Sequence, residues 1–166
     1  MALAAAVTGC RKDIRPNVGM GMILPPGAVR SVVPEDQLFL MATEISTPLP
    51  SYPSDLVKAS PADIMVCAEL VLGTDGAVTS VRPLYAIPEC PLLQSELDPR
   101  FTEAVRDAVL KWQFFAAALC TFPPGVPKDD DCKSQGVTIR HVPIKLAFVF
   151  TFSTKHGRAT VSKKAT

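Results

Sequence analysis

The sequence has few of the groups on which enzymes and binders of charged polymers depend. Only two of its 166 residues are histidine, and the formal net charge is +1. So small a net charge gives no global field that would attract nucleic acid. The glycine-rich phosphate loop, the GxSxG nucleophile motif and the HExxH zinc motif are also missing. The chain is therefore expected to be non-catalytic, with no cofactor, no metal and no nucleic-acid partner.

The cysteines and histidines allow two other interpretations. Cys120 or Cys132 with His141 would supply a nucleophile and a base, and adding the acidic run 129–131 would supply metal ligands. No local signature supports the first, and the spacing matches no structural zinc pattern. A disulfide between the two cysteines would also consume both thiols. A solvated acidic loop is the preferred interpretation.

Long hydrophobic runs are absent as well, so no segment of the sequence is long enough to cross a bilayer as a helix. Residues 1–10 are apolar and end in Val7-Thr8-Gly9-Cys10, which resembles the lipobox of bacterial lipoproteins. No Lys or Arg precedes this run, and it is shorter than a secretory h-region. A start site placed too far downstream accounts for both departures, whereas the alternative is a poorly packed N-terminal end.

We therefore expect residues 1–10 to be a lipoprotein-type signal remnant and Cys10 to be the lipidation site. Arg11 stands after the cysteine where Asp would retain a lipoprotein at the inner membrane, so the outer membrane is favoured. Four cysteines then remain, an even number that suits an oxidising compartment. Cys120 and Cys132 flank a short loop rich in turn formers and are predicted to form a disulfide. Cys67 lies in an apolar run and is either a buried thiol or a partner of Cys90.

The first third of the chain carries weak structural signals. Residues 11–47 are expected to be an N-terminal arm or linker, because 11–28 are rich in Gly and Pro and show little periodicity. Two short β-prone runs, 29–33 and 38–45, are separated by Pro34-Glu35-Asp36 and form a candidate hairpin.

The second half is more regular. Residues 64–72 alternate between apolar and other side chains, and the Asp75-Gly76 turn predicts a hairpin with a bulged return strand over 77–85. Asp98 and Pro99 predict the start of a helix whose apolar stripe runs to Trp112. The last strand, 144–152, alternates again, with Ile144, Leu146, Phe148, Phe150 and Phe152 on one face.

This order of elements predicts an α+β fold, a two-layer sandwich in which an antiparallel three-stranded sheet packs on one main helix. Extra strands from the N-terminal arm are compatible with it. The domain is expected over residues 48–153, with an inserted loop at 116–141. A basic tail follows at 154–166, because no acidic residue occurs after Asp131. The tail is either solvated or in contact with an anionic polymer or lipid.

Residues 48–153 resemble the TonB C-terminal domain family. The resemblance is carried by Tyr52-Pro53 before the first long strand, the Asp75-Gly76 hairpin, a helix ending Trp112-Gln113-Phe114 and a last strand ending at Phe152. Trp112 and Tyr52 are expected to pack in the core. The sequence departs from the family in three ways: it shows no N-terminal membrane helix, it has no proline-rich rod, and the segment 116–141 is longer and carries two cysteines.

The resemblance implies a periplasmic protein-interaction domain that binds a partner peptide by strand addition in outer-membrane transport. The partner would be an outer-membrane TonB-dependent transporter, and the membrane contact would be the lipid anchor. The alternative is a structural envelope lipoprotein that forms a homodimer through the same sheet edge. We predict that this edge is the last strand, where Lys145, Ala147, Val149 and Thr151 would flank an added strand.

Overall fold

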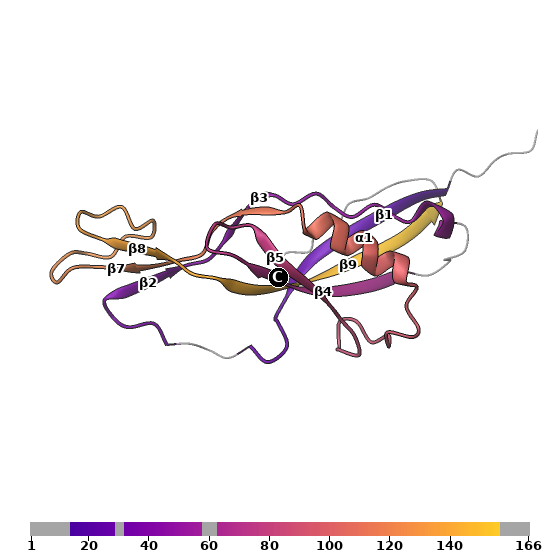
Figure 1. The fold of residues 1–166 in the computed structure, drawn as a ribbon, viewed down its shortest axis with the longest axis horizontal. Helices are drawn as coiled ribbons and strands as arrows, with labels where there is room; N and C mark the ends of the chain where they lie inside the picture. The colour runs from indigo at the N-terminus through magenta and orange to yellow at the C-terminus, as the bar shows by residue number, and fades with distance from the viewer. Residues whose placement is uncertain (1–13, 29–31, 58–62, 157–166) are drawn as a thin grey trace, which may run out of the picture.

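Antiparallel strands are the main regular structure of the described chain, residues 14–28, 32–57 and 63–156 of the computed structural model (Figure 1). The main sheet has the strand order β1-β9-β4-β5 and carries one α-helix, α1. Their bounds are β1 Ile14–Ile23, β4 Ile64–Leu72, β5 Val78–Leu84, α1 Pro99–Val109 and β9 Ile144–His156. The fold is thus of the predicted α+β class, but the main sheet has four strands because the N-terminal arm adds β1.

Two smaller sheets accompany the main one. Their strands are β2 Gln37–Leu40, β7 Ala118–Thr121 and β8 Thr138–His141 in one sheet, and β3 Thr43–Ser46 with β6 Gln113–Phe115 in the other. A short 3-10 turn, η1 Ser54–Leu56, precedes β4. The β2-β7-β8 sheet projects from one end of the molecule, away from α1 (Figure 1).

The β4–β5 hairpin forms as its sequence predicts. Asp75 accepts a hydrogen bond from the backbone N–H of Ala77 at 3.1 Å, and Gly76 adopts a φ of 80°, which is costly for other residues. The register shifts between Val71 and Leu72, so the predicted bulge is confirmed. The alternation in β4 turns Val66 and Leu70 toward the helix, and it turns the cysteine of this strand to the opposite face.

Helix α1 begins as predicted, because the Asp98 side chain accepts a hydrogen bond from the backbone N–H of Arg100, and Pro99 occupies the first helical position. The stripe of Phe101, Val105 and Val109 is buried. The predicted end at 112–114 is wrong, since the helix ends at Val109 and 113–115 form β6. The backbone N–H of Phe114 donates to the carbonyl of Gly76, which draws this segment into a strand.

The Asp98 cap gives a pH prediction. Its hydrogen bonds from Arg100 lower the pKa of Asp98 from 3.8 to about 2. A depressed pKa means that the stabilisation is complete above pH 3.8 and is lost as the pH falls through about 2. In thermal melts, Asp98→Asn should therefore be less stable than the parent at pH 7, and the difference should disappear near pH 2. An equal difference at both pH values would contradict this assignment.

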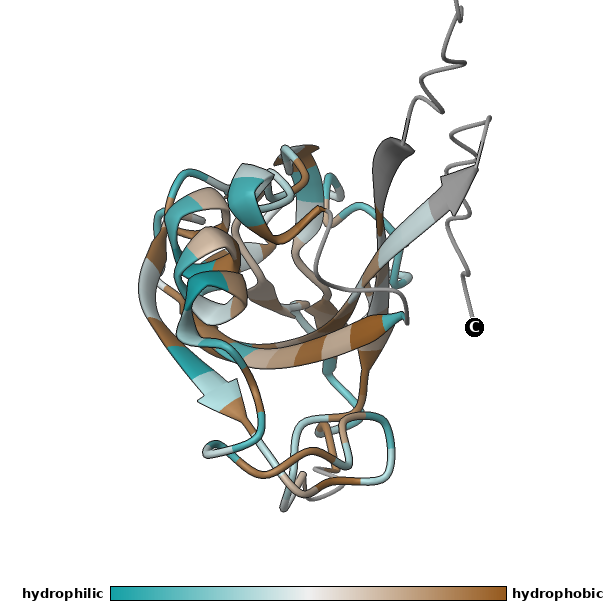
Figure 2. Cartoon of the chain, turned by 90° about the vertical axis from the view of Figure 1, so that its right-hand side faces the viewer, coloured by the Kyte–Doolittle hydropathy of each residue, from teal (hydrophilic) through white to brown (hydrophobic). Residues whose placement is uncertain are grey.

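The main core lies between α1 and one face of the sheet, where hydrophobic strand residues face the helix (Figure 2). Trp112 is 1% exposed, its ring centroid lies 5.0 Å from that of Phe148, and its indole Nε1 donates to the Pro48 carbonyl at 2.9 Å. Tyr52 packs edge-on against Phe101 and Phe152. Both aromatic residues are therefore packing residues, as expected.

The opposite face of the sheet is covered in part by the segment after β5. A disulfide joins Cys67 of β4 to Cys90 of this segment, with a Cα–Cα distance of 5.9 Å. Leu84 and Ala147 pack against it to form a small second cluster. Cys67 is therefore not a free thiol.

The insertion 116–141 is not a plain loop, because it contains β7 and β8. It holds the Cys120–Cys132 disulfide, with a Cα–Cα distance of 6.1 Å, in agreement with the predicted pair. The predicted hairpin of 29–33 with 38–45 is wrong: residues 29–31 lie outside the described chain, residues 32–33 form no strand, and β2 pairs with β7. The reason is burial, since Leu38 and Leu40 of β2 pack against the disulfide cluster.

Candidate partner-binding edge

The last strand is not the edge of the sheet, so the predicted binding edge must be corrected. Strand β9 lies between β1 and β4, and its backbone is paired on both sides. Ala147 is fully buried against the Cys67–Cys90 cluster. Lys145 lies 3.8 Å from Glu69, a buried carboxylate that also pairs with Arg82. Lys145, Ala147, Val149 and Thr151 thus point to one face of an interior strand.

The segment that covers β9 is the arm expected to be a linker. Strand β1 pairs with β9 over ten residues, from Ile14 opposite His156 to Ile23 opposite Ala147. Val18, Met20 and Met22 share the face of the β9 phenylalanines. Gly19 and Gly21 separate these apolar residues, and because glycine is frequent in linkers the segment resembles one. The alternation of Val18, Met20 and Met22 is nevertheless the period-two pattern of a strand, and it is the sequence signal that predicts β1.

Within the described residues, no further strand pairs with the outer side of β1. Pro16 cannot donate a backbone hydrogen bond, so the useful open edge runs over residues 17–23. The other outer strand, β5, is protected in three ways: it contains Pro83, it pairs across a bulge, and Ala77 beside it bridges to Gln113. Natural sheets use such features to prevent unwanted pairing. Strand β1 is therefore the more accessible edge.

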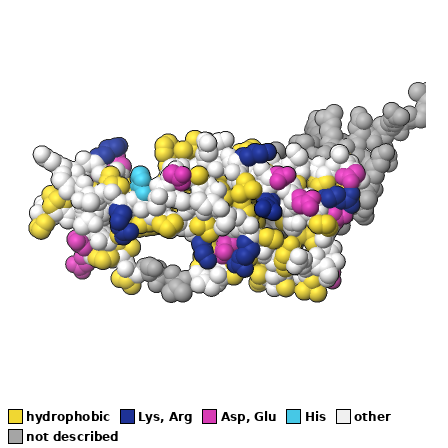
Figure 3. All heavy atoms as spheres, in the orientation of Figure 1, with side chains coloured by type: hydrophobic (Ala, Val, Ile, Leu, Met, Phe, Trp, Pro, Cys, Tyr) yellow, Lys and Arg dark blue, Asp and Glu magenta, His cyan; other side chains and the backbone are white. Residues whose placement is uncertain are grey.

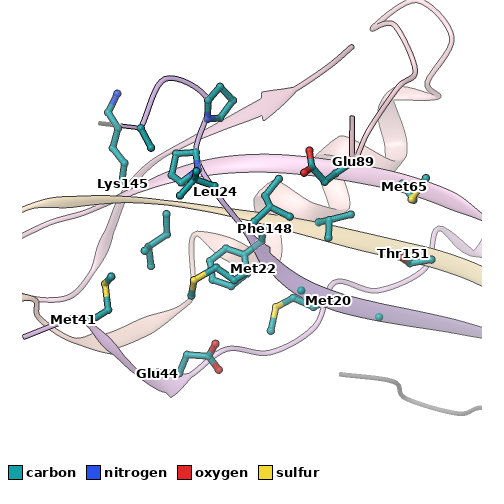
Figure 4. A pocket seen from close by; sticks show the side chains of 18 of the residues that line it. Met20, Met22, Leu24, Met41, Glu44, Met65, Glu89, Lys145, Phe148 and Thr151 are labelled. Carbon is teal, nitrogen blue, oxygen red and sulfur yellow. The ribbon is translucent and has the colours of Figure 1, made fainter. Parts of the chain in front are cut away.

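An open groove of about 1340 Å³ runs along this edge of β1 (Figure 4). Its lining is largely apolar and includes Met20, Met22, Leu24, Met41 and Phe148. Met22 and Met41 are 47% and 57% exposed. Methionine side chains are flexible and polarisable, so they adapt to apolar partners of different shapes. The groove thus lies where the side chains of an added strand would project.

Charged groups at the groove are few and mixed. Glu44, Glu89 and Lys145 contribute to its lining. Figure 3 likewise shows Lys and Arg side chains interspersed with Asp and Glu over one face of the molecule, with hydrophobic side chains between them. Such a surface favours recognition through backbone pairing and apolar contact over steering by a field of one sign.

Three of the residues considered for thiol or metal chemistry, Cys120, Cys132 and Asp129, have structural roles. Cys120 and Cys132 are bonded to each other. Asp129 accepts hydrogen bonds from the backbone and hydroxyl of Ser134 at 2.6 Å, and these bonds lower its pKa. Among the described residues, no group of three His, Cys, Asp or Glu side chains is placed to hold a metal ion.

The remaining predicted site residue, Cys10, lies outside the described residues, as does most of the basic tail. The helices of the described part include none that is long and apolar enough to span a membrane. Comparison of the chain with protein-family models, with curated proteins and with solved structures finds no match.

Proposed function

We propose that this chain is a non-catalytic protein-interaction domain of the bacterial envelope, which binds an extended segment of a partner by strand addition at the outer edge of β1. The observation that carries the proposal is the open edge over residues 17–23, beside a groove lined by methionine. Backbone hydrogen bonds would supply affinity, and the groove would select alternate apolar side chains of the partner. The TonB C-terminal resemblance points to an outer-membrane TonB-dependent transporter as the partner.

A second copy of the chain is the alternative partner. Two β1 edges that pair about a twofold axis would join two four-stranded sheets into one continuous sheet. The edge suits this pairing, because its glycines carry no side chain that would obstruct a second strand and its methionines would interdigitate. The protein would then be a structural lipoprotein that self-associates, with no transporter partner.

Photo-crosslinking in cells tests both forms of the proposal. A photoreactive amino acid replaces Met22 at the edge or, as a control, Phe115, which is 66% exposed on β6. The Met22 probe should give a discrete adduct, with a transporter in the first case and with a second copy in the alternative. The Phe115 probe should give neither. Adducts only from Phe115, or none from Met22, would refute strand addition at β1.

The proposed location is the periplasmic face of the envelope, with a lipid anchor at Cys10. Two disulfides in the described chain support an oxidising compartment. Because acyl chains would supply the anchor, the parent protein should fractionate with membranes and Cys10→Ser should move it to the soluble fraction. Unchanged membrane association of this variant would contradict the anchor.

A further inference from the structure

Methionine is concentrated at the groove beside β1. The chain has five methionines, and all four that follow Met1 line this groove. Met20 and Met22 lie on one face of β1, opposite Phe150 and Phe148 of β9. Figure 4 shows Met41 on the same side of the sheet as this pair, with Glu44 below, whereas Met65 lies toward the opposite side. Met20, Met22 and Met41 are called the thioether cluster below.

We propose that the thioether cluster binds a soft monovalent cation, Cu(I). Thioether sulfur is a neutral, polarisable ligand, and soft sulfur ligands select Cu(I) over the harder divalent ions. Met20 and Met22 are separated by one residue on a strand, so their Cα atoms lie roughly 6.6 Å apart. Each side chain has three rotatable bonds and can turn its sulfur toward a shared ion.

The ligand types in the groove lining favour a soft cation over Zn²⁺. The charged groups of the lining are mixed, Glu44 and Glu89 with Lys145, so net charge does not decide which ion binds. The groove lining contains no histidine or cysteine among the described residues, so it lacks the ligands that Zn²⁺ prefers. The inference is independent of strand addition, because it depends on sulfur chemistry and not on the apolar shape of the groove.

The test uses the Cys10→Ser variant with both disulfides intact, because a free thiolate would bind Cu(I) by itself. An assay for free thiols checks that none is present. Under anaerobic conditions the protein competes for Cu(I) with a chromogenic chelator, and copper X-ray absorption identifies the ligand atoms. We expect one bound Cu(I) in a shell of sulfur. The triple variant Met20→Leu/Met22→Leu/Met41→Leu removes the three proposed ligands. Its affinity for Cu(I) should fall by at least about tenfold, because the loss of a single residue that only orients a metal ligand already lowers metal affinity by that factor.

Leucine has nearly the volume of methionine, so this triple variant should keep its fold, which a thermal melt checks. It should also keep the crosslink to a strand partner from a photoreactive amino acid at Leu24, which follows β1, is 79% exposed and lines the groove, so the two proposals can fail separately. The matched control, Met65→Leu, should bind Cu(I) like the parent. Binding that survives the triple substitution, a copper shell of oxygen or nitrogen, or failure of the parent to compete with the chelator would each overturn the proposal.

Discussion

Phe148→Ala is expected to lower the free energy of unfolding by about 3–5 kcal/mol, as large truncations in a protein core do. Phe148 is 1% exposed, and its ring lies edge-on to Trp112 at 5.0 Å between centroids. Its removal takes away the aromatic contact and leaves a cavity beneath α1. Folded domains are stable by only about 5–15 kcal/mol, so much of the total would be lost. Urea denaturation of the purified protein measures the change.

Phe115→Ala is the matched control, because it removes the same atoms from a ring that is 66% exposed. A surface substitution of this kind should change the free energy of unfolding by less than about 0.5 kcal/mol. Similar losses in the two variants would mean that Phe148 is not in the core that holds α1 on the sheet.

Gly76→Ala should be destabilising by about 2–5 kcal/mol, the sum of a left-handed backbone penalty and of overpacking. Gly76 has a φ of 80°, and a Cβ atom there would lie 1.9 Å from the backbone oxygen of Phe114. Because the obstacle is backbone, the β4–β5 turn and β6 would have to separate. The hydrogen bond from the Phe114 N–H to the Gly76 carbonyl would be lost with them.

Gly125→Ala separates the two contributions to this effect. Gly125 has a φ of 81°, but a Cβ atom there would meet nothing within 4 Å. This variant should therefore lose only the backbone term of about 1–2 kcal/mol. Urea denaturation of both variants gives the comparison, and an equal loss would show that contact with Phe114 contributes nothing.

The regular second half of the chain could be predicted because its signals are local. The Asp75-Gly76 turn, the Asp98 cap and the alternation in β4 and β9 each depend on residues close in sequence. The Cys120–Cys132 pair was found for the same reason, since only a short loop separates the two residues.

The arrangement of the edges could not be predicted because it depends on pairing between distant segments. Strand β1 meets β9 across more than a hundred residues, and its glycines weaken the periodic signal. Strand β2 pairs with β7 instead of forming a local hairpin, because its apolar side chains cover the disulfide cluster. As a consequence, the outer strand that could accept a partner is β1, whereas the sequence predicted β9.

One measurement tests the central claim most directly: the yield of the Met22 crosslink in a pair of proline variants. Phe115→Ala is the folded control, because Phe115 is exposed on β6, in a different sheet from β1. Along a strand, the backbone N–H groups of consecutive residues point alternately toward one neighbouring strand and toward the other side. One of the two variants, Met20→Pro or Gly21→Pro, therefore removes a hydrogen bond to β9, and the other removes a donor from the open edge. The variant that keeps the parent's melting temperature is the one that alters only the open edge. The account predicts that this folded variant loses the crosslink. An undiminished crosslink in that variant would contradict strand addition at β1.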